Sequence, residues 1–201
     1  MNDLADSLKV AFAPAHGWDS AAVHPAKIWS VLVFQTIPLA LIPAVAWYFG
    51  ATRSGWTFSG ETTYLTSSSA LVLTGLFYIA MVGAVLVLSA LTHWMASTYD
   101  SGSSFGEAVK LISFTATPFF LAGVLGFYPL LWLDLTVGVA VACYCIFLLY
   151  RGTSVVLGVA PERAFLYASA IFAAALVGFV ALLSGTIILW DLGPAPEFVS
   201  G

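Results

Sequence analysis

Five long apolar runs divide the chain. They cover residues 29–49, 70–93, 109–127, 129–150 and 165–190. A helix needs roughly 20 residues to cross a hydrocarbon core of about 30 Å, and each run is close to that length. Because backbone in lipid must satisfy its own hydrogen bonds, continuous apolar runs predict helices, whereas barrel strands would alternate apolar and polar residues. The pattern therefore predicts an all-α membrane protein, a bundle of about five transmembrane helices.

The third run, residues 109–127, is the shortest and contains a proline. Pro118 removes one helical hydrogen bond and is expected to set a kink, while the hydroxyl of Thr117 is placed to bond a freed backbone carbonyl. Only Phe127-Tyr128-Pro129 separates this run from the next, so Pro129 is expected to set an antiparallel hairpin. A re-entrant pair in place of two full spans is the alternative.

The segment before the first run has a different pattern. Leu4, Leu8 and Phe12 recur at helical spacing with charged residues between them, and Pro14 ends that stretch. Trp18 suits the headgroup region, so Pro14 and Trp18 are expected to anchor an amphipathic helix on the cytoplasmic face. A disordered tail is the alternative. No basic start precedes an apolar core here, so we expect no signal peptide.

These patterns divide the chain into an interfacial segment (1–28), a five-helix membrane domain (29–190) and a short tail (191–201). Between the first two runs, residues 51–69 form a loop rich in Ser, Thr and Gly that is too short for a domain. With the N-terminus inside, five of the six basic residues face the cytoplasm: Lys9, Lys27, Lys110, Arg151 and Arg163. Only Arg53 is then outside, so the positive-inside rule predicts a cytoplasmic N-terminus and an outward-facing C-terminus.

Composition supports lipid as the main solvent. The chain is 61% hydrophobic and 8% charged, whereas soluble domains contain about 25% charged residues. The net charge of −4 and the lack of a basic stripe argue against nucleic-acid binding. Cys143 and Cys145 point to different faces of one apolar helix, as small buried residues do.

Few residues carry candidate chemistry. Asp134 is an ionisable group inside a run, toward its outer end, and such groups are candidates for function because a charge in lipid is costly. A polar path between kinked helices would use Gln35, Thr36, Thr115 and Thr117 beside it. His16, Asp19 and His24 lack metal-ligand spacing. We therefore expect no metal site, no cofactor and no catalytic pair, hence no enzyme.

Several motifs, in order along the chain, resemble the Yip1 family and in particular its bacterial branch. They are Pro14-Ala15-His16-Gly17-Trp18, Phe105-Gly106-Glu107-Ala108-Val109-Lys110, Phe114-Thr115-Ala116-Thr117-Pro118, the turn at Pro129, the run from Tyr144 to Gly152, and Val159-Ala160-Pro161-Glu162-Arg163. The resemblance implies a five-span bundle with a cytoplasmic N-terminus in a bacterial inner membrane. Eukaryotic relatives are associated with Rab GTPases and vesicle traffic, a role that does not transfer to a bacterial-type member.

The sequence thus favours a non-enzymatic membrane protein that interacts with membrane lipids and other membrane proteins. Phe105, Gly106 and Lys110 form the expected cytoplasmic entry to the third helix. A homo-oligomer is a further possibility, because small residues recur at four-residue spacing at Ala170, Ala174 and Gly178, and at Ala80 and Ala84. The alternative function is a small channel or transporter, in which changing Asp134 to Leu would abolish flux.

Overall fold

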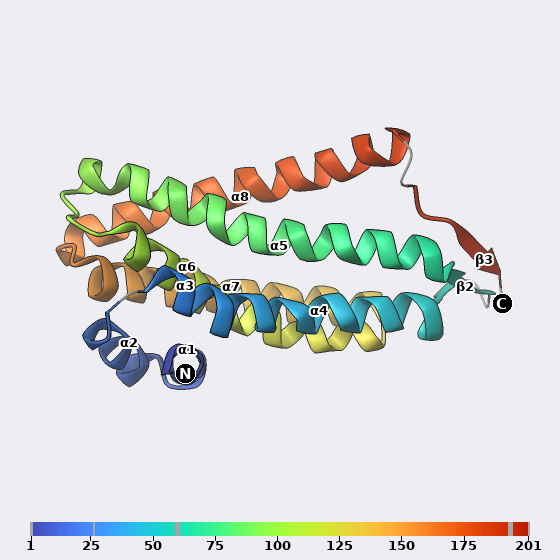
Figure 1. Cartoon of the computed structure of the whole chain (residues 1–201), viewed down its shortest axis with the longest axis horizontal. Helices are drawn as coiled ribbons and strands as arrows, with labels where there is room; N and C mark the ends of the chain where they lie inside the picture. Colours follow the sequence, from blue (N-terminus) through green and yellow to red (C-terminus); the bar gives the residue numbers. More distant parts are fainter. Residues whose placement is uncertain (1, 26, 59–60, 193–194, 201) are drawn as a thin grey trace.

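The computed structural model describes residues 2–25, 27–58, 61–192 and 195–200. Five helical segments are long and apolar enough to cross a membrane: Ile28–Ser54, Ser67–Tyr99, Phe105–Phe127, Leu131–Leu157 and Pro161–Ile188. They lie side by side along the long axis of the molecule (Figure 1). The all-α bundle of five membrane helices that the sequence predicted is confirmed.

The second and third spans start before the predicted apolar runs because polar residues cap them. The second span, α5 (Ser67–Met95) followed by η3 (Ala96–Tyr99), starts after Thr66, whose side chain accepts a hydrogen bond from the Ser69 N–H. The third, α6 (Phe105–Ala122), starts after Ser104. Hydropathy locates the lipid-facing part of a helix, whereas its ends are set by caps that satisfy the terminal N–H groups.

The first span is not one regular helix. It is built from α3 (Ile28–Val31), the π-helical turns η1 (Leu32–Thr36) and η2 (Gly50–Ser54), and α4 (Ile37–Phe49) between them. Pro38 lies in the first turn of α4 and Pro43 inside it, and each lacks the N–H of a regular helix. A π-helical turn changes the direction of its side chains relative to a regular α-helix, and η1 does so for Gln35 and Thr36.

The third and fourth spans form an antiparallel hairpin. The helix α6 continues through Pro118 and passes into the 3-10 turn η4 (Gly123–Phe127), and α7 (Leu131–Leu157) returns beside it. Phe105–Phe127 has 23 residues. At 1.5 Å per residue that is roughly 34 Å, enough for a full crossing rather than a re-entrant loop. The fifth span is α8 (Pro161–Leu192).

The N-terminal segment forms two helices, α1 (Asn2–Phe12) and α2 (Pro14–Val23), which we call the N-terminal hairpin. Pro14 ends the first helix, as predicted, and also starts the second, because a proline in the first turn loses no hydrogen bond. A Cβ on Gly17 would lie 2.5 Å from the Val10 nitrogen, so only glycine allows the two helices to pack this closely.

A small antiparallel sheet lies at the other end of the bundle (Figure 1). Its strands are β1 (Trp56–Phe58), β2 (Glu61–Leu65) and β3 (Phe198–Ser200), in the order β1-β2-β3. Both the predicted loop and the predicted tail therefore contain strands, which the sequence analysis missed. We call the end of the bundle next to the N-terminal hairpin the hairpin end, and the end next to this sheet the sheet end.

Small residues bring the first span against η4 near the sheet end. A Cβ on Gly123 would lie 2.4 Å from the Cβ of Pro43, and one on Gly50 would lie 1.8 Å from the Gly126 carbonyl oxygen. The small residues picked from the sequence do not make comparably close contacts: Gly178 has nothing within 4 Å of a built Cβ, and Ala84 is exposed. Ala80, Ala170 and Ala174 are half-buried.

Candidate functional site: the polar stripe of the third span

Three polar side chains follow one face of α6. Lys110, Ser113 and Thr117 are three and four residues apart, which places them on one side of a helix. All three are buried, with exposed fractions of 2%, 0% and 0%. Buried polar groups in a membrane protein need partners, because lipid supplies none. We call these residues the polar stripe, and each has partners on another element.

The Lys110 ammonium group binds the C-terminus of α2. Its Nζ donates to the carbonyl of Ala21 at 2.8 Å and to that of His24 at 2.6 Å. The last carbonyls of a helix have no partner inside the helix and form the negative end of its dipole, so a cation is favoured there. Asp3, Asp6 and Glu107 place negative charge around the ammonium group. Lys110 thus links the hairpin to the third span.

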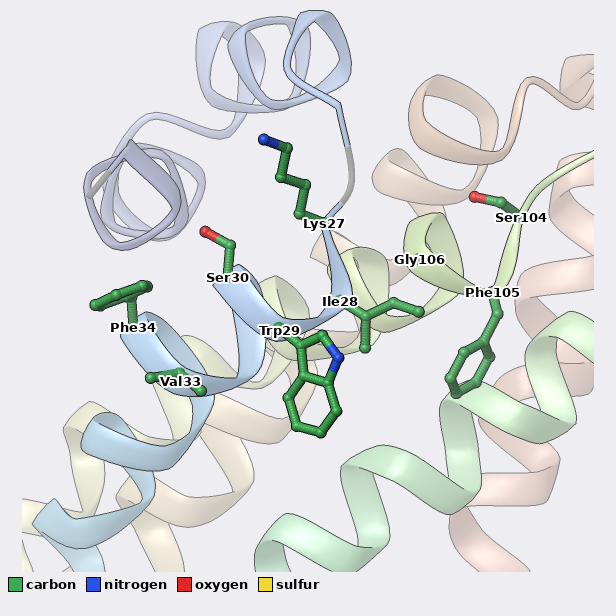
Figure 2. Close-up of a pocket in the computed structure, with 9 residues that line it drawn as sticks. All are labelled: Lys27, Ile28, Trp29, Ser30, Val33, Phe34, Ser104, Phe105 and Gly106. Atoms are coloured by element: carbon green, nitrogen blue, oxygen red, sulfur yellow. The ribbon is translucent and has the colours of Figure 1, made fainter.

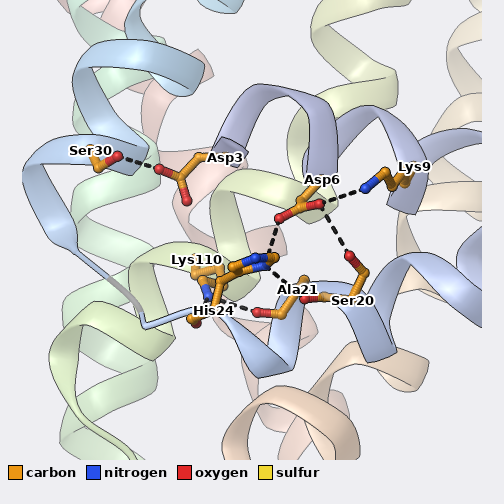
Figure 3. Close-up of polar contacts among 8 residues, drawn as sticks. All are labelled: Asp3, Asp6, Lys9, Ser20, Ala21, His24, Ser30 and Lys110. Carbon is orange, nitrogen blue, oxygen red and sulfur yellow. Dashed lines mark hydrogen bonds and ion pairs between the residues drawn. The ribbon is translucent and has the colours of Figure 1, made fainter. Parts of the chain in front are cut away.

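A second set of contacts closes the hairpin on itself (Figure 3). The carboxylate of Asp6 lies 3.0 Å from Lys9 Nζ and 3.0 Å from His24 Nδ1, and it accepts a hydrogen bond from Ser20 at 3.2 Å. Asp3 accepts a hydrogen bond from Ser30, at the start of the first span. One carboxylate therefore joins α1 to α2, and the other joins α1 to α3.

Trp18 packs inside the protein and not among headgroups. Its side chain is fully buried and stacks on Phe114, with 6.4 Å between the ring centroids. A Cβ on Gly152 of α7 would lie 2.6 Å from the indole ring, so that glycine leaves the space the ring occupies. The predicted interfacial position of Trp18 is therefore wrong, because the ring buries more surface between α6 and α7 than at a lipid interface.

The other two members of the polar stripe bind the first span. Gln35 Nε2 donates to the Ser113 carbonyl at 3.1 Å and to Thr117 Oγ1 at 2.9 Å. Thr36 Oγ1 lies 2.9 Å from Ser113 Oγ and 3.0 Å from Gln35 Oε1. Gln35 and Thr36 are both 0% exposed. The four side chains form a closed cluster whose polar groups satisfy one another.

Two residues proposed for the polar path lie apart from this cluster. The side chain of Thr115 is half-buried, and its hydroxyl has no hydrogen-bond partner among the described residues. Asp134 lies in the first turn of α7, near the sheet end, and is also half-buried.

The Thr117 hydroxyl was expected to bond the backbone carbonyl that Pro118 leaves without a donor. That carbonyl belongs to Phe114, whereas the Thr117 hydroxyl donates to the Ser113 carbonyl at 3.2 Å.

The remaining predicted residues shape the ends of α6. Phe105 and Gly106 form its first turn, next to Ser104, which makes a reciprocal cap with Glu107. Pro129 lies in the turn between η4 and α7, where the Leu130 N–H donates to the Tyr128 carbonyl. Sequence reasoning missed Ser113, Asp3 and Asp6. The three-and-four spacing of polar residues in α6 was the signal that pointed to Ser113.

No group of three or more His, Cys, Asp or Glu residues with the geometry of a metal site occurs in the described part of the chain.

Comparison with known proteins identifies the fold family. Residues 8–182, which include most of the N-terminal hairpin and the whole polar stripe, match the Yip1 domain. The chain belongs to the Yip1 family.

Two relatives of this Yip1-family protein are inner membrane proteins of bacteria. The inner membrane protein YohC of Escherichia coli strain K12 is 34% identical over 157 residues, which cover 77% of this chain and 80% of the relative. YohC of E. coli O6:H1 matches with the same identity and coverage. No solved structure matches the chain. The relatives and the five apolar helices support an integral inner-membrane protein.

In this Yip1-family protein, replacing Lys110 with methionine is expected to loosen the N-terminal hairpin. The change leaves the buried Ala21 carbonyl and the partly buried His24 carbonyl without this donor, which costs about 2 kcal/mol. Amide hydrogen exchange in α1 and α2, measured in lipid discs, should then speed up by roughly 30-fold. Lys9→Met is the control, because Lys9 is 57% exposed and such surface pairs contribute at most about 1 kcal/mol. Unchanged exchange in Lys110→Met would contradict the link.

Proposed function

We propose that this protein is a non-enzymatic membrane protein of the Yip1 type that acts through contacts with other membrane proteins or lipids, in membrane organisation or assembly. One observation carries the proposal: the N-terminal hairpin is fixed to the membrane bundle while its far side is exposed. Lys110, Trp18 and the Asp3–Ser30 hydrogen bond fix its inner side. A rigid surface outside the spans is suited to recognition, since little ordering entropy is lost on binding.

The exposed side of the hairpin carries large apolar groups. Phe12 is 78% exposed and Val23 is 83% exposed, and neither belongs to one of the five membrane spans. His16, Asp19 and Val23 lie on one face of α2 and are all exposed. Apolar groups rimmed by polar ones mark contact surfaces. We call Phe12, His16, Asp19 and Val23 the outer face of the hairpin.

The charge distribution supports a cytoplasmic position for this face. Five basic residues belong to the hairpin end: Lys9, Lys27, Lys110, Arg151 and Arg163. Arg53, in η2, belongs to the sheet end and packs over Phe49. Basic residues are retained on the cytoplasmic side, so the proposal places the hairpin inside and the C-terminus outside.

Co-purification tests the proposal. Full-length protein with a C-terminal tag is extracted into native membrane discs, and the accompanying proteins and lipids are quantified by mass spectrometry. The double variant Phe12→Ser, Val23→Ser should lose a stoichiometric partner that the unchanged protein retains. Phe198→Ser is the control, because Phe198 is 57% exposed in β3 at the sheet end. A preparation with no specific partner protein or lipid would contradict the proposal.

The non-enzymatic character is supported by the closed cluster around the polar stripe. The amide of Gln35 and the hydroxyls of Thr36 and Thr117 bond to one another or to Ser113, and none is exposed. A catalytic group needs access to a substrate, and these groups have none in this arrangement. Their hydrogen bonds instead hold the first and third spans together.

A small channel or transporter is the second candidate, favoured by the presence of polar side chains between the first and third spans. Such a path would have to connect the closed cluster to Asp134 near the sheet end. In liposomes, the transport account predicts that Asp134→Leu abolishes flux. The interaction account predicts that this variant folds and retains its partner. A flux that Asp134→Leu leaves unchanged would remove Asp134 from the transport account.

A further inference from the structure

A groove lies between the beginnings of the first and third spans. It has a volume of about 700 Å³ and is lined by residues of α3, η1 and the first turn of α6. Its apolar lining comes from Ile28, Trp29, Val33, Phe34 and Phe105. Lys27, Ser30 and Ser104 supply its polar side chains, and we call these three residues its rim. The groove opens to the surroundings, since Trp29 is 79% exposed and Phe34 52% exposed. Its volume is in the range of small-molecule sites.

The two ends of the groove differ in polarity. Figure 2 shows the Lys27 ammonium group pointing toward the N-terminal hairpin, while Trp29 and Phe105 point the opposite way, along the membrane spans. The first and third spans begin at Ile28 and Phe105, and the beginnings of spans are expected to lie where headgroups meet acyl chains. This arrangement is complementary to an amphiphile with its head at Lys27 and its chains beside the two aromatic rings.

The rim is suited to an anionic head. Lys27 is exposed and makes no ion pair with a described residue, whereas Lys9 pairs with Asp6 and Arg163 with Asp100. The first N–H groups of α6, at Phe105 and Gly106, have no partner within the helix and add the positive end of its dipole.

The other polar groups at the rim are already engaged. Ser30 donates to Asp3, and Ser104 makes its cap with Glu107. The carboxylates of Asp3 and Glu107 thus lie against Ser30 and Ser104, and both oppose the binding of an anion. Lys27 is therefore the residue on which recognition of a negative charge depends.

We propose that this groove binds an anionic phospholipid. The phosphate group is held by Lys27 and the first turn of α6, and an acyl chain lies between Trp29 and Phe105. The inference deepens the proposed function, since it names one lipid partner and rests on the same placement in the membrane. It is distinct from protein binding at the outer face of the hairpin, which uses none of these residues.

Native mass spectrometry of the purified full-length protein tests this proposal. The protein is equilibrated with equal amounts of phosphatidylglycerol and phosphatidylcholine of identical chains, and retained lipids are counted after detergent washing. We expect one preferentially retained phosphatidylglycerol. Lys27→Gln should lower the preference by about fivefold, since one basic residue near a membrane surface contributes about that factor. Trp29→Ala should lower retention of both lipids, because it removes chain contacts.

Two matched controls keep the test specific. Arg53→Gln removes the same charge at the sheet end, and Trp132→Ala removes an indole that is 68% exposed on α7. Both should retain phosphatidylglycerol as the unchanged protein does. Equal retention of the two lipids by the unchanged protein, or equal losses in Lys27→Gln and Arg53→Gln, would overturn the proposal. Either result would leave partner capture through Phe12 and Val23 unaffected, so the two failures are distinguishable.

Discussion

Replacing Trp18 with alanine should separate the N-terminal hairpin from the membrane bundle. The indole is fully buried against Phe114 and the space left by Gly152, so its removal creates a large cavity between α2, α6 and α7. Truncation of a buried tryptophan costs about 3–5 kcal/mol. Lys110 still binds the C-terminus of α2 in this variant, and the spans keep their contacts with one another. The loss should therefore be seen as detachment of the N-terminal hairpin and not as unfolding of the spans.

Limited proteolysis in lipid discs measures this detachment. Cleavage within residues 4–23 should become at least about 100-fold faster in Trp18→Ala, as expected for a loss of 3 kcal/mol or more. Trp29→Ala removes the same side chain at a position that is 79% exposed, and its cleavage rate should stay near that of the unchanged protein. Equal rates in the two variants would show that burial of Trp18 does not hold the hairpin.

At the sheet end, Gly50→Val should destabilise the bundle itself. A Cβ at this position would lie 1.8 Å from the carbonyl oxygen of Gly126, and backbone cannot move aside as a flexible side chain can. Overpacking of a tight contact typically costs 1–3 kcal/mol, and the upper part of that range, about 3 kcal/mol, applies where backbone is the obstacle. The first span would have to separate from η4.

The midpoint of thermal unfolding in detergent reports this change. It should fall clearly in Gly50→Val, while Gly178→Val should leave it nearly unchanged, because nothing lies within 4 Å of a Cβ at Gly178. Both variants add the same side chain to a glycine of a membrane helix. A similar midpoint for the two variants would mean that the first span and η4 are not packed as closely as described.

Much of the fold could be predicted from the sequence because lipid imposes one simple rule on the backbone. Every span must be a helix of sufficient length, so apolar runs located all five. The ends were less predictable, since Thr66 and Ser104 cap helices with side-chain hydrogen bonds that hydropathy does not register. The strand Phe198–Ser200 escaped notice because its partner β2 is more than 130 residues away in the chain.

The candidate site was less predictable for a different reason. Gln35, Thr36, Thr117 and Lys110 were each noticed, but hydropathy does not say which polar residues meet. Trp18 was assigned to the interface because tryptophan is common there, whereas Gly152, 134 positions later, provides a buried space for it. Tertiary contacts of this kind depend on how α2, α6 and α7 pack, which no local pattern records.

The N-terminal hairpin is a fixed part of the membrane domain, held by Lys110 and the buried ring of Trp18. Hydrogen–deuterium exchange of the unchanged full-length protein in lipid discs tests it directly. Amides of residues 4–12 and 15–23 should exchange slowly, at rates within about 100-fold of those in the buried part of α6. Exchange of both helices at the rate of an unstructured peptide would contradict the account and would favour a disordered tail.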